Sequence, residues 1–114
     1  MYLGKGVRIF LKEQAKERFL DLKNGNDKES KSIFNSIERI KEVLKNNPQY
    51  GDPIKKELIP RELQQLGIGN LYRIELSNYW RMLYTLEGTE TEISVFVLKI
   101  LNHKEYNQLF GYKN

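Results

Sequence analysis

The sequence predicts a single α+β domain over residues 1–114, with a strand, a helical hairpin, a three-stranded antiparallel meander and a short C-terminal helix. In the first half of the chain, apolar residues recur at helical spacing. The second half carries short runs of strand-forming residues separated by tight turns. No repeat or linker rich in proline, glycine or serine divides the chain, and 114 residues is an ordinary length for one domain.

Composition and charge exclude several classes of protein. The chain has no cysteine and one histidine, which excludes disulfides, thiolate metal sites and sites built from several histidines. No apolar run approaches the roughly 20 residues of a membrane helix, and residues 1–12 lack the features of a signal peptide, so we expect a cytoplasmic protein. The net charge of +4 permits an anionic partner without requiring one. Most of the surplus of basic over acidic side chains lies in the helical half, where it forms either a solvated helix face or a surface that contacts phosphates.

The first half is expected to form one strand and two helices. Residues 7–11 alternate in polarity and predict the first strand. Residues 12–22 follow a helical pattern, which residues 24–26 (NGN) interrupt. Pro48 ends a second helix at residues 27–45, and the short connection between the helices favours an antiparallel hairpin. The second helix carries the strongest periodic signal in the chain, an apolar stripe made of Ile33, Ile37, Ile40 and Leu44.

The second half is expected to form the meander. Residues 48–53 are rich in turn formers, residues 55–59 are irregular or extended, and residues 61–66 form one or two helical turns. Trp80 and Tyr84 have apolar neighbours on both faces and are expected in the core. Consecutive strands are joined by short turns and therefore pair antiparallel. The three strands are predicted at residues 71–76, 80–86 and 93–101, with connections at residues 77–79 and 87–90.

The last predicted element is a short helix that ends at Phe110. Asn102 precedes Glu105 by three residues, which is the spacing of a capping box. Two helices on one face of a small sheet would leave the other face partly open. A curved sheet of this kind offers a concave surface for binding.

The order of elements and several motifs resemble the RelE/ParE superfamily of bacterial and archaeal type II toxins. Residues 71–76 (LYRIEL) and 80–85 (WRMLYT) resemble the strand pair of that family. Residues 102–112 (NHKEYNQLFGY) resemble the ending of one RelE-like branch, and residues 47–53 resemble the segment that ends its second helix. The likeness covers essentially the whole chain as topology and residues 47–112 as motif.

The resemblance implies one of two activities. RelE-type toxins are metal-independent ribonucleases that cut messenger RNA, usually in the ribosomal A site. ParE-type toxins share the fold and poison DNA gyrase. A cognate antitoxin protein neutralises both kinds. Likeness to the RelE branch therefore implies an mRNA interferase that uses no metal or cofactor and has mRNA, the ribosome and an antitoxin as partners. The alternatives are a gyrase inhibitor and a non-catalytic relative that binds RNA or protein.

Four residues carry the expected catalytic chemistry. Metal-free RNA cleavage needs a proton taken from the 2′-OH, a phosphate held in line, charge stabilisation and a proton given to the leaving 5′-oxygen. By the resemblance, Arg81 clamps the scissile phosphate and Arg73 contacts a neighbouring one, because arginine grips phosphate in a bidentate manner. His103 transfers protons, and Tyr106, one helical turn away, stacks a base or donates a proton.

All four of these residues also have a structural interpretation. If residues 77–79 form a three-residue hairpin loop, Glu75 faces Arg81, and opposite charges across strands contribute roughly 0.2–1 kcal/mol. Such an ion pair is compatible with catalysis, since Glu75 would then orient Arg81. Tyr106 is alternatively a core residue under the sheet, and His103 a capping or surface histidine.

Three further residues are candidates for substrate binding. Glu75 stands where the family pattern has a lysine, so it either acts as a base itself or signals reduced activity. Lys55 and Lys56 lie in the preceding loop, where they either reach the substrate or are simply solvated. Arg73 has a similar alternative as an exposed strand arginine.

Overall fold

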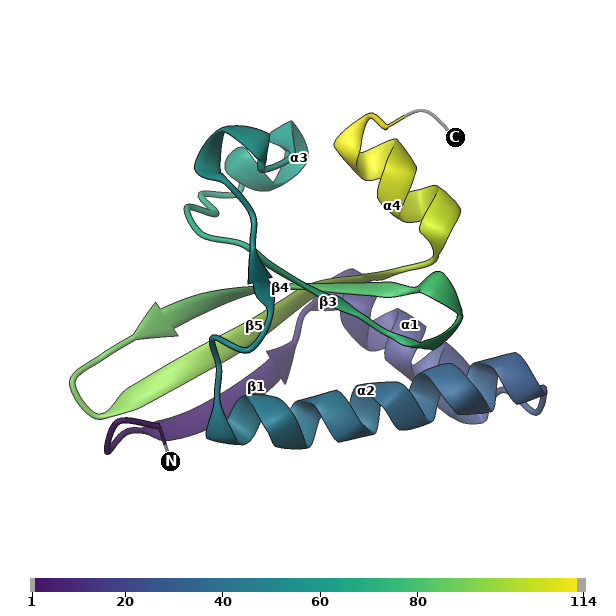
Figure 1. Ribbon diagram of the computed structural model, residues 1–114, viewed down its shortest axis with the longest axis horizontal. Helices are drawn as coiled ribbons and strands as arrows, with labels where there is room; N and C mark the ends of the chain where they lie inside the picture. The colour runs from purple at the N-terminus through teal and green to yellow at the C-terminus, as the bar shows by residue number, and fades with distance from the viewer. Residues whose placement is uncertain (1, 113–114) are drawn as a thin grey trace.

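The computed structural model describes residues 2–112, which form a mixed α+β fold with a five-stranded sheet and four α-helices (Figure 1). Met1, Lys113 and Asn114 of the predicted domain lie outside the described residues. The elements in chain order are β1 (Gly6–Leu11), α1 (Glu13–Asn24), α2 (Lys28–Asn46), β2 (Asp52–Pro53), a 3-10 turn (Lys56–Leu58), α3 (Arg61–Gln64), β3 (Tyr72–Glu75), a second 3-10 turn (Ser77–Tyr79), β4 (Arg81–Gly88), β5 (Glu92–Leu101) and α4 (His103–Phe110).

The strands lie in the order β1-β5-β4-β3-β2. Strands β3, β4 and β5 form the predicted antiparallel meander, although β4 extends to Gly88, so the turn before β5 lies two residues later than expected. Two pairings were not predicted. Strand β1 pairs in parallel with β5, with Ile9 opposite Val95, and the two-residue β2 pairs with β3.

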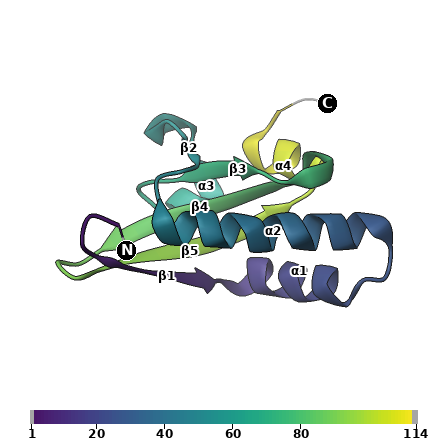
Figure 2. The ribbon, with the colours of Figure 1, turned by 60° about the horizontal axis from the view of Figure 1, so that its bottom comes forward.

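Helices α1 and α2 cover one face of the sheet and lie side by side, as the predicted hairpin requires (Figure 2). Helix α2 begins after Asp27, whose side chain accepts a hydrogen bond from the Ser30 N–H at 3.1 Å. The predicted apolar stripe of α2 is buried against the sheet, where Met82 and Tyr84 of β4 meet it. No helix within residues 2–112 is long and apolar enough to cross a membrane.

The opposite face of the sheet is more covered than the sequence predicts. Helix α4 and the segment around α3 both pack on this face (Figure 1) and build a second, smaller core. Its buried members are Ile59, Leu63, Leu71, Leu83, Leu101 and Tyr106. The chain therefore has apolar cores on both sides of the sheet, because the segment around α3 and helix α4 contribute apolar side chains to the second face.

The connection between β3 and β4 is the predicted three-residue loop, Ser77–Tyr79. Asn78 and Tyr79 have left-handed backbone angles, with φ of 58° and 62°, a region that non-glycine residues rarely occupy. The loop sets the register in which Glu75 lies opposite Arg81, as predicted. Trp80, directly after the loop, is buried as expected.

Candidate functional site

The two arginines with expected roles lie on adjacent strands and on the same face of the sheet. Arg73 is on β3 and Arg81 on β4, and both project toward α4, away from the core beneath α1 and α2. The side chains are 35% and 13% exposed, respectively. Nε of Arg73 and Nε of Arg81 are buried and have no hydrogen-bond partner within residues 2–112. Buried donors without a hydrogen bond are uncommon in native proteins.

Helix α4 brings His103 and Tyr106 onto these arginines. The Tyr106 hydroxyl accepts a hydrogen bond from a terminal nitrogen of Arg73 at 3.3 Å, and the Arg81 guanidinium lies 5.0 Å from the Tyr106 ring centroid. Nδ1 of His103 lies 3.5 Å from the same Arg81 nitrogen that donates to the Tyr79 carbonyl. The structure thus brings together all four residues with expected catalytic roles.

Tyr106 is a core residue as well as a site residue. Its ring is packed between Arg81 and Phe110, whose ring centroid lies 4.5 Å away, and the residue is only 4% exposed. The ring therefore has no open face for base stacking, and its polar contribution is the hydroxyl that holds Arg73. That hydrogen bond has the largest effect and raises the pKa of Arg73 above its ordinary value. Burial lowers the pKa by less than the hydrogen bond raises it, and the nearby Asp52 carboxylate adds a further, smaller increase.

Two acidic side chains accompany the arginines. Glu75 lies 3.8 Å from Nε of Arg81 and is 65% exposed, so the predicted cross-strand ion pair is present. Asp52 of β2 lies 3.6 Å from a terminal nitrogen of Arg73. Both acids line a cleft of about 280 Å³ that reaches Arg73. The formal charge of the two arginines is therefore balanced locally.

The two loop lysines lie in different places. Lys55 lines a pocket of about 190 Å³ together with Arg73 and Tyr106, so the structure places it beside the site. Lys56 lines a separate hollow with Gln64 and Gly67, and the structure does not bring it to the arginines. Lys56 is the first residue of the 3-10 turn, and Lys55 directly precedes it.

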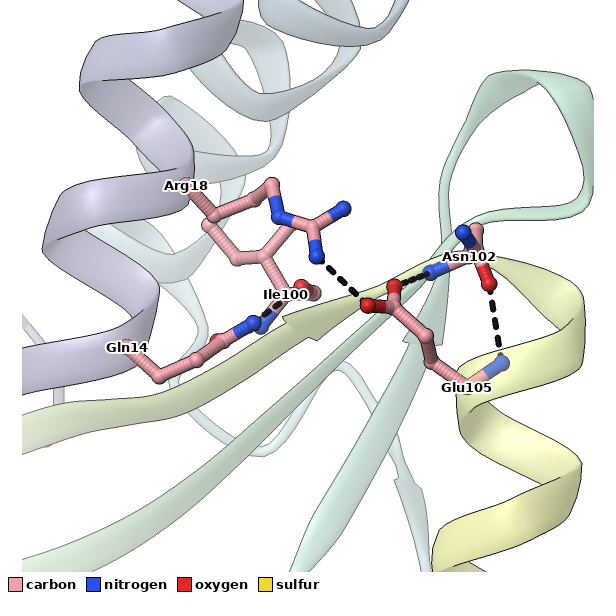
Figure 3. Close-up of polar contacts among 5 residues, drawn as sticks. All are labelled: Gln14, Arg18, Ile100, Asn102 and Glu105. Carbon is pink, nitrogen blue, oxygen red and sulfur yellow. Dashed lines mark hydrogen bonds and ion pairs between the residues drawn. The ribbon is translucent and has the colours of Figure 1, made fainter.

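Helix α4 is held in place at its first turn, as Figure 3 shows. The Asn102 side chain accepts from the Glu105 N–H at 2.8 Å, and the Glu105 carboxylate accepts from the Asn102 N–H at 2.9 Å, which forms the predicted capping box. The other oxygen of Glu105 accepts a hydrogen bond from Arg18 of α1 at 2.6 Å. Arg18 also lies over the ring of Trp80, 5.0 Å from its centroid.

A second contact from α1 reaches the end of β5 (Figure 3). The side-chain amide of Gln14 accepts from the Ile100 N–H and donates to the Ile100 carbonyl, both at 3.0 Å. Helix α1 is thus bonded to β5 at Ile100 and to the first turn of α4 at Glu105. The position of His103 relative to Arg81 therefore depends on α1 as well as on the sheet.

Several residues of the site were not predicted from the sequence. Asn107 lies 3.2 Å from Nε2 of His103, and its position four residues along the same helix is a signal that sequence analysis could have used. Asp52 reaches Arg73 through a two-residue strand that has no periodicity to detect. Arg18 is one of several charged residues on α1, and nothing in its spacing marks it.

Comparison of the chain with protein-family models, with curated proteins and with solved structures finds no match. Within residues 2–112, no group of three or more histidine, cysteine, aspartate or glutamate side chains is placed to hold a metal ion. The candidate site consists of the arginine, histidine and carboxylate groups described above.

Proposed function

We propose that the chain is the toxin of a type II toxin–antitoxin system, with the RelE/ParE topology, and that it is a metal-independent endoribonuclease which cleaves mRNA at the ribosome. One observation carries the proposal. Arg81 contacts His103 through a terminal nitrogen and Glu75 through Nε, so two groups that transfer protons flank one group that binds phosphate. A base, an anion clamp and an acid in contact are the parts that RNA cleavage without a metal requires.

Each residue then has a defined task. The 2′-oxygen of the RNA attacks phosphorus after losing its proton, and the bond from phosphorus to the 5′-oxygen breaks as that oxygen gains a proton. Arg81 holds the phosphate and offsets its developing charge. Glu75 takes the 2′ proton and His103 supplies the proton to the 5′-oxygen. The products are a 2′,3′-cyclic phosphate and a 5′-hydroxyl end.

Arg73 and Tyr106 support this centre. Arg73 is partly exposed and contacts the next phosphate of the RNA, while the Tyr106 hydroxyl fixes its orientation.

The test is RNA cleavage by the purified chain, with and without ribosomes and in the presence of a metal chelator. Arg81→Ala is expected to lower the rate about 10²–10³-fold through loss of charge stabilisation. His103→Ala is expected to lower it about 10²–10⁴-fold. Arg39→Ala, on the exposed surface of α2, is the matched control and should cleave normally. Full activity in both site variants would refute the assignment.

The role of Glu75 has its own comparison. Glu75→Gln keeps the size of the side chain and removes its basicity, so it should reduce cleavage if the carboxylate takes the 2′ proton. Glu75→Lys places a cation beside Arg81, as the resembled family does. If Glu75→Gln remains as active as the unmodified chain, the carboxylate serves only to orient Arg81.

The balanced charge favours a second candidate, a non-catalytic member of the same fold that binds RNA or protein. Asp52 and Glu75 each lie within 4 Å of an arginine nitrogen, which weakens attraction for phosphate. A gyrase inhibitor of the ParE kind belongs to the same group of binding proteins. Translation and DNA replication, measured separately after induction without antitoxin, distinguish these three candidate functions. An mRNA interferase stops translation, a gyrase inhibitor stops replication, and a non-catalytic binding protein stops neither.

A further inference from the structure

A small pocket lies against Arg73, and Glu75 is not part of its lining. It has a volume of about 190 Å³, and Arg73 and Tyr106 form part of its lining. The rest of the lining combines apolar, aromatic and charged side chains, which are Asp52, Pro53, Ile54, Lys55, Leu58, Phe110 and Tyr112. Arg73 and Tyr106 have tasks at the cleavage site, but the rest of the lining has none.

The aromatic wall of the pocket is built by the end of α4. Gly111 has φ of 73° and ψ of 18°, the left-handed conformation that glycine adopts at little cost. The Tyr112 N–H bonds to the Asn107 carbonyl at 2.8 Å and the Gly111 N–H to the Gln108 carbonyl at 3.3 Å, a Schellman motif. This turn folds the chain back, so Tyr112 lies against the aromatic side chains of α4 instead of continuing away from them.

The result is a compact cluster of three rings. The ring centroids of Tyr112 and Phe110 are 5.7 Å apart with an interplanar angle of 23°, those of Phe110 and Tyr106 are 4.5 Å apart, and those of Tyr106 and Tyr112 are 6.2 Å apart. Tyr106 is buried, but Tyr112 is 52% exposed. The cluster therefore presents aromatic surface to solvent at Tyr112, in the lining that includes Arg73, and stacking on such a surface stabilises a bound nucleobase by about 1–3 kcal/mol.

The charged groups around this surface suit a nucleotide. Arg73 and Lys55 are cations at the pocket that can contact phosphates on either side of a bound base. Asp52 is 76% exposed, and its carboxylate can accept a hydrogen bond from an exocyclic amino group, as acidic side chains do with cytosine. Uracil has no such amino group.

We propose that this pocket binds one nucleobase of the RNA, next to the phosphate held at Arg81, and that it prefers bases with an exocyclic amino group. The proposal rests on the proposed ribonuclease function, since Arg73 is shared between the pocket and the cleavage site. Tyr112 supplies the stacking surface, Lys55 the adjacent phosphate contact and Asp52 the preference among bases.

The test uses an RNA octamer of adenosines that carries 2′-O-methyl groups, so that it cannot be cleaved, with a single abasic position moved along it. For the unmodified chain, one abasic position is expected to weaken binding about tenfold more than the others, from the loss of one stacked base. In Tyr112→Ala that position should lose its special effect, whereas Tyr112→Phe should retain it. Phe10→Ala removes an exposed aromatic ring from the opposite edge strand and should leave the pattern unchanged.

Asp52→Asn tests the base preference of the same pocket. The unmodified chain should bind the adenosine octamer more tightly than the uridine octamer, and the difference between the two affinities should be smaller in Asp52→Asn. The proposed base pocket is refuted if binding of the unmodified chain does not depend on the abasic position, or if Tyr112→Ala shows the same dependence as the unmodified chain. Failure of the unmodified chain to bind the octamer also refutes it. The cleavage assay tests the ribonuclease proposal separately. If the chain cleaves RNA but its binding does not depend on the abasic position, the pocket proposal is refuted and the ribonuclease proposal stands.

Discussion

Replacing Arg18 with alanine should loosen the first turn of α4 and shift His103 relative to Arg81. Arg18 is the side chain of α1 that bonds to Glu105, and it also covers Trp80, the residue before Arg81. The variant therefore acts on both halves of the candidate site without touching a residue assigned to catalysis.

The expected cost follows from these two contacts. A hydrogen bond to a charged group contributes about 1.5–3 kcal/mol, and the lower part of that range applies because the Arg18 and Glu105 side chains are 23% and 33% exposed. The contact of the guanidinium with the Trp80 ring adds about 0.5–1 kcal/mol. We expect Arg18→Ala to lower the free energy of unfolding by about 2–3 kcal/mol, or roughly 8–15 °C in Tm for a domain of this size.

Chemical unfolding followed by circular dichroism measures this cost, and a double-mutant cycle isolates the pair. Glu105→Gln keeps an oxygen for the Asn102 N–H and removes the charge, so it is the partner variant. The coupling energy should be about 1 kcal/mol or more. Because the chain has one histidine and one tryptophan, NMR of the His103 ring and fluorescence of Trp80 report directly on the folded site. Both signals should change in Arg18→Ala under fully folded conditions.

Two results would refute this reasoning. A coupling energy below about 0.3 kcal/mol would show that Arg18 and Glu105 act independently. An unchanged His103 signal in a folded Arg18→Ala protein would show that the contact stabilises the fold without positioning the histidine. Arg39→Ala serves as the control for the loss of an exposed arginine from the helical layer.

Four other predictions concern stability. Burial raises the pKa of Tyr84 to about 12, so the neutral phenol stabilises the fold fully below pH 10. This contribution of about 2–3 kcal/mol is lost as the pH rises toward 12. The free energy of unfolding measured at each pH should lose this dependence in Tyr84→Phe. At neutral pH, Tyr84→Phe should cost about 2–4 kcal/mol in urea unfolding, since its hydroxyl serves the buried Pro48 carbonyl and Gly51 N–H. Gly51→Ala should also lower Tm, because an added Cβ would lie 2.9 Å from the Tyr84 ring. Hydrogen bonds from Ser30 lower the pKa of Asp27. The Asp27 cap therefore stabilises α2 above the ordinary carboxylate pKa, and this stabilisation is lost as the pH falls through the lowered pKa. In an acid titration, Asp27→Asn should lose less stability than the unmodified chain.

The long elements were predictable because their signals are local. The apolar stripe of α2 has helical spacing, and Asp27 caps its start, so pattern and capping agree. The three-residue loop before Trp80 sets the register of β3 and β4, which is why the pairing of Glu75 with Arg81 follows from the length of the loop. The capping box at Asn102 likewise follows from a three-residue spacing.

The remaining features depend on contacts between distant segments. A six-residue strand such as β1 carries no mark of its partner, and its parallel pairing with β5 joins residues more than eighty positions apart. The second core arises because the segment around α3 and helix α4 dock on the same sheet face. The contact of Arg73 with the Tyr106 hydroxyl follows from that docking, and so does the different placement of Lys55 and Lys56.

The amide of Gln14 also affects how the sheet meets other molecules. Strand β1 ends at Leu11, so the last residues of β5 have no strand beside them on that side. The Ile100 N–H and carbonyl face this edge, where a strand from another chain can pair. Gln14 presents a donor and an acceptor in the spacing of a peptide group and occupies both positions. One side chain thus closes the edge at this residue against intermolecular β-pairing, a protection that a hydrophobic residue at position 14 would not give.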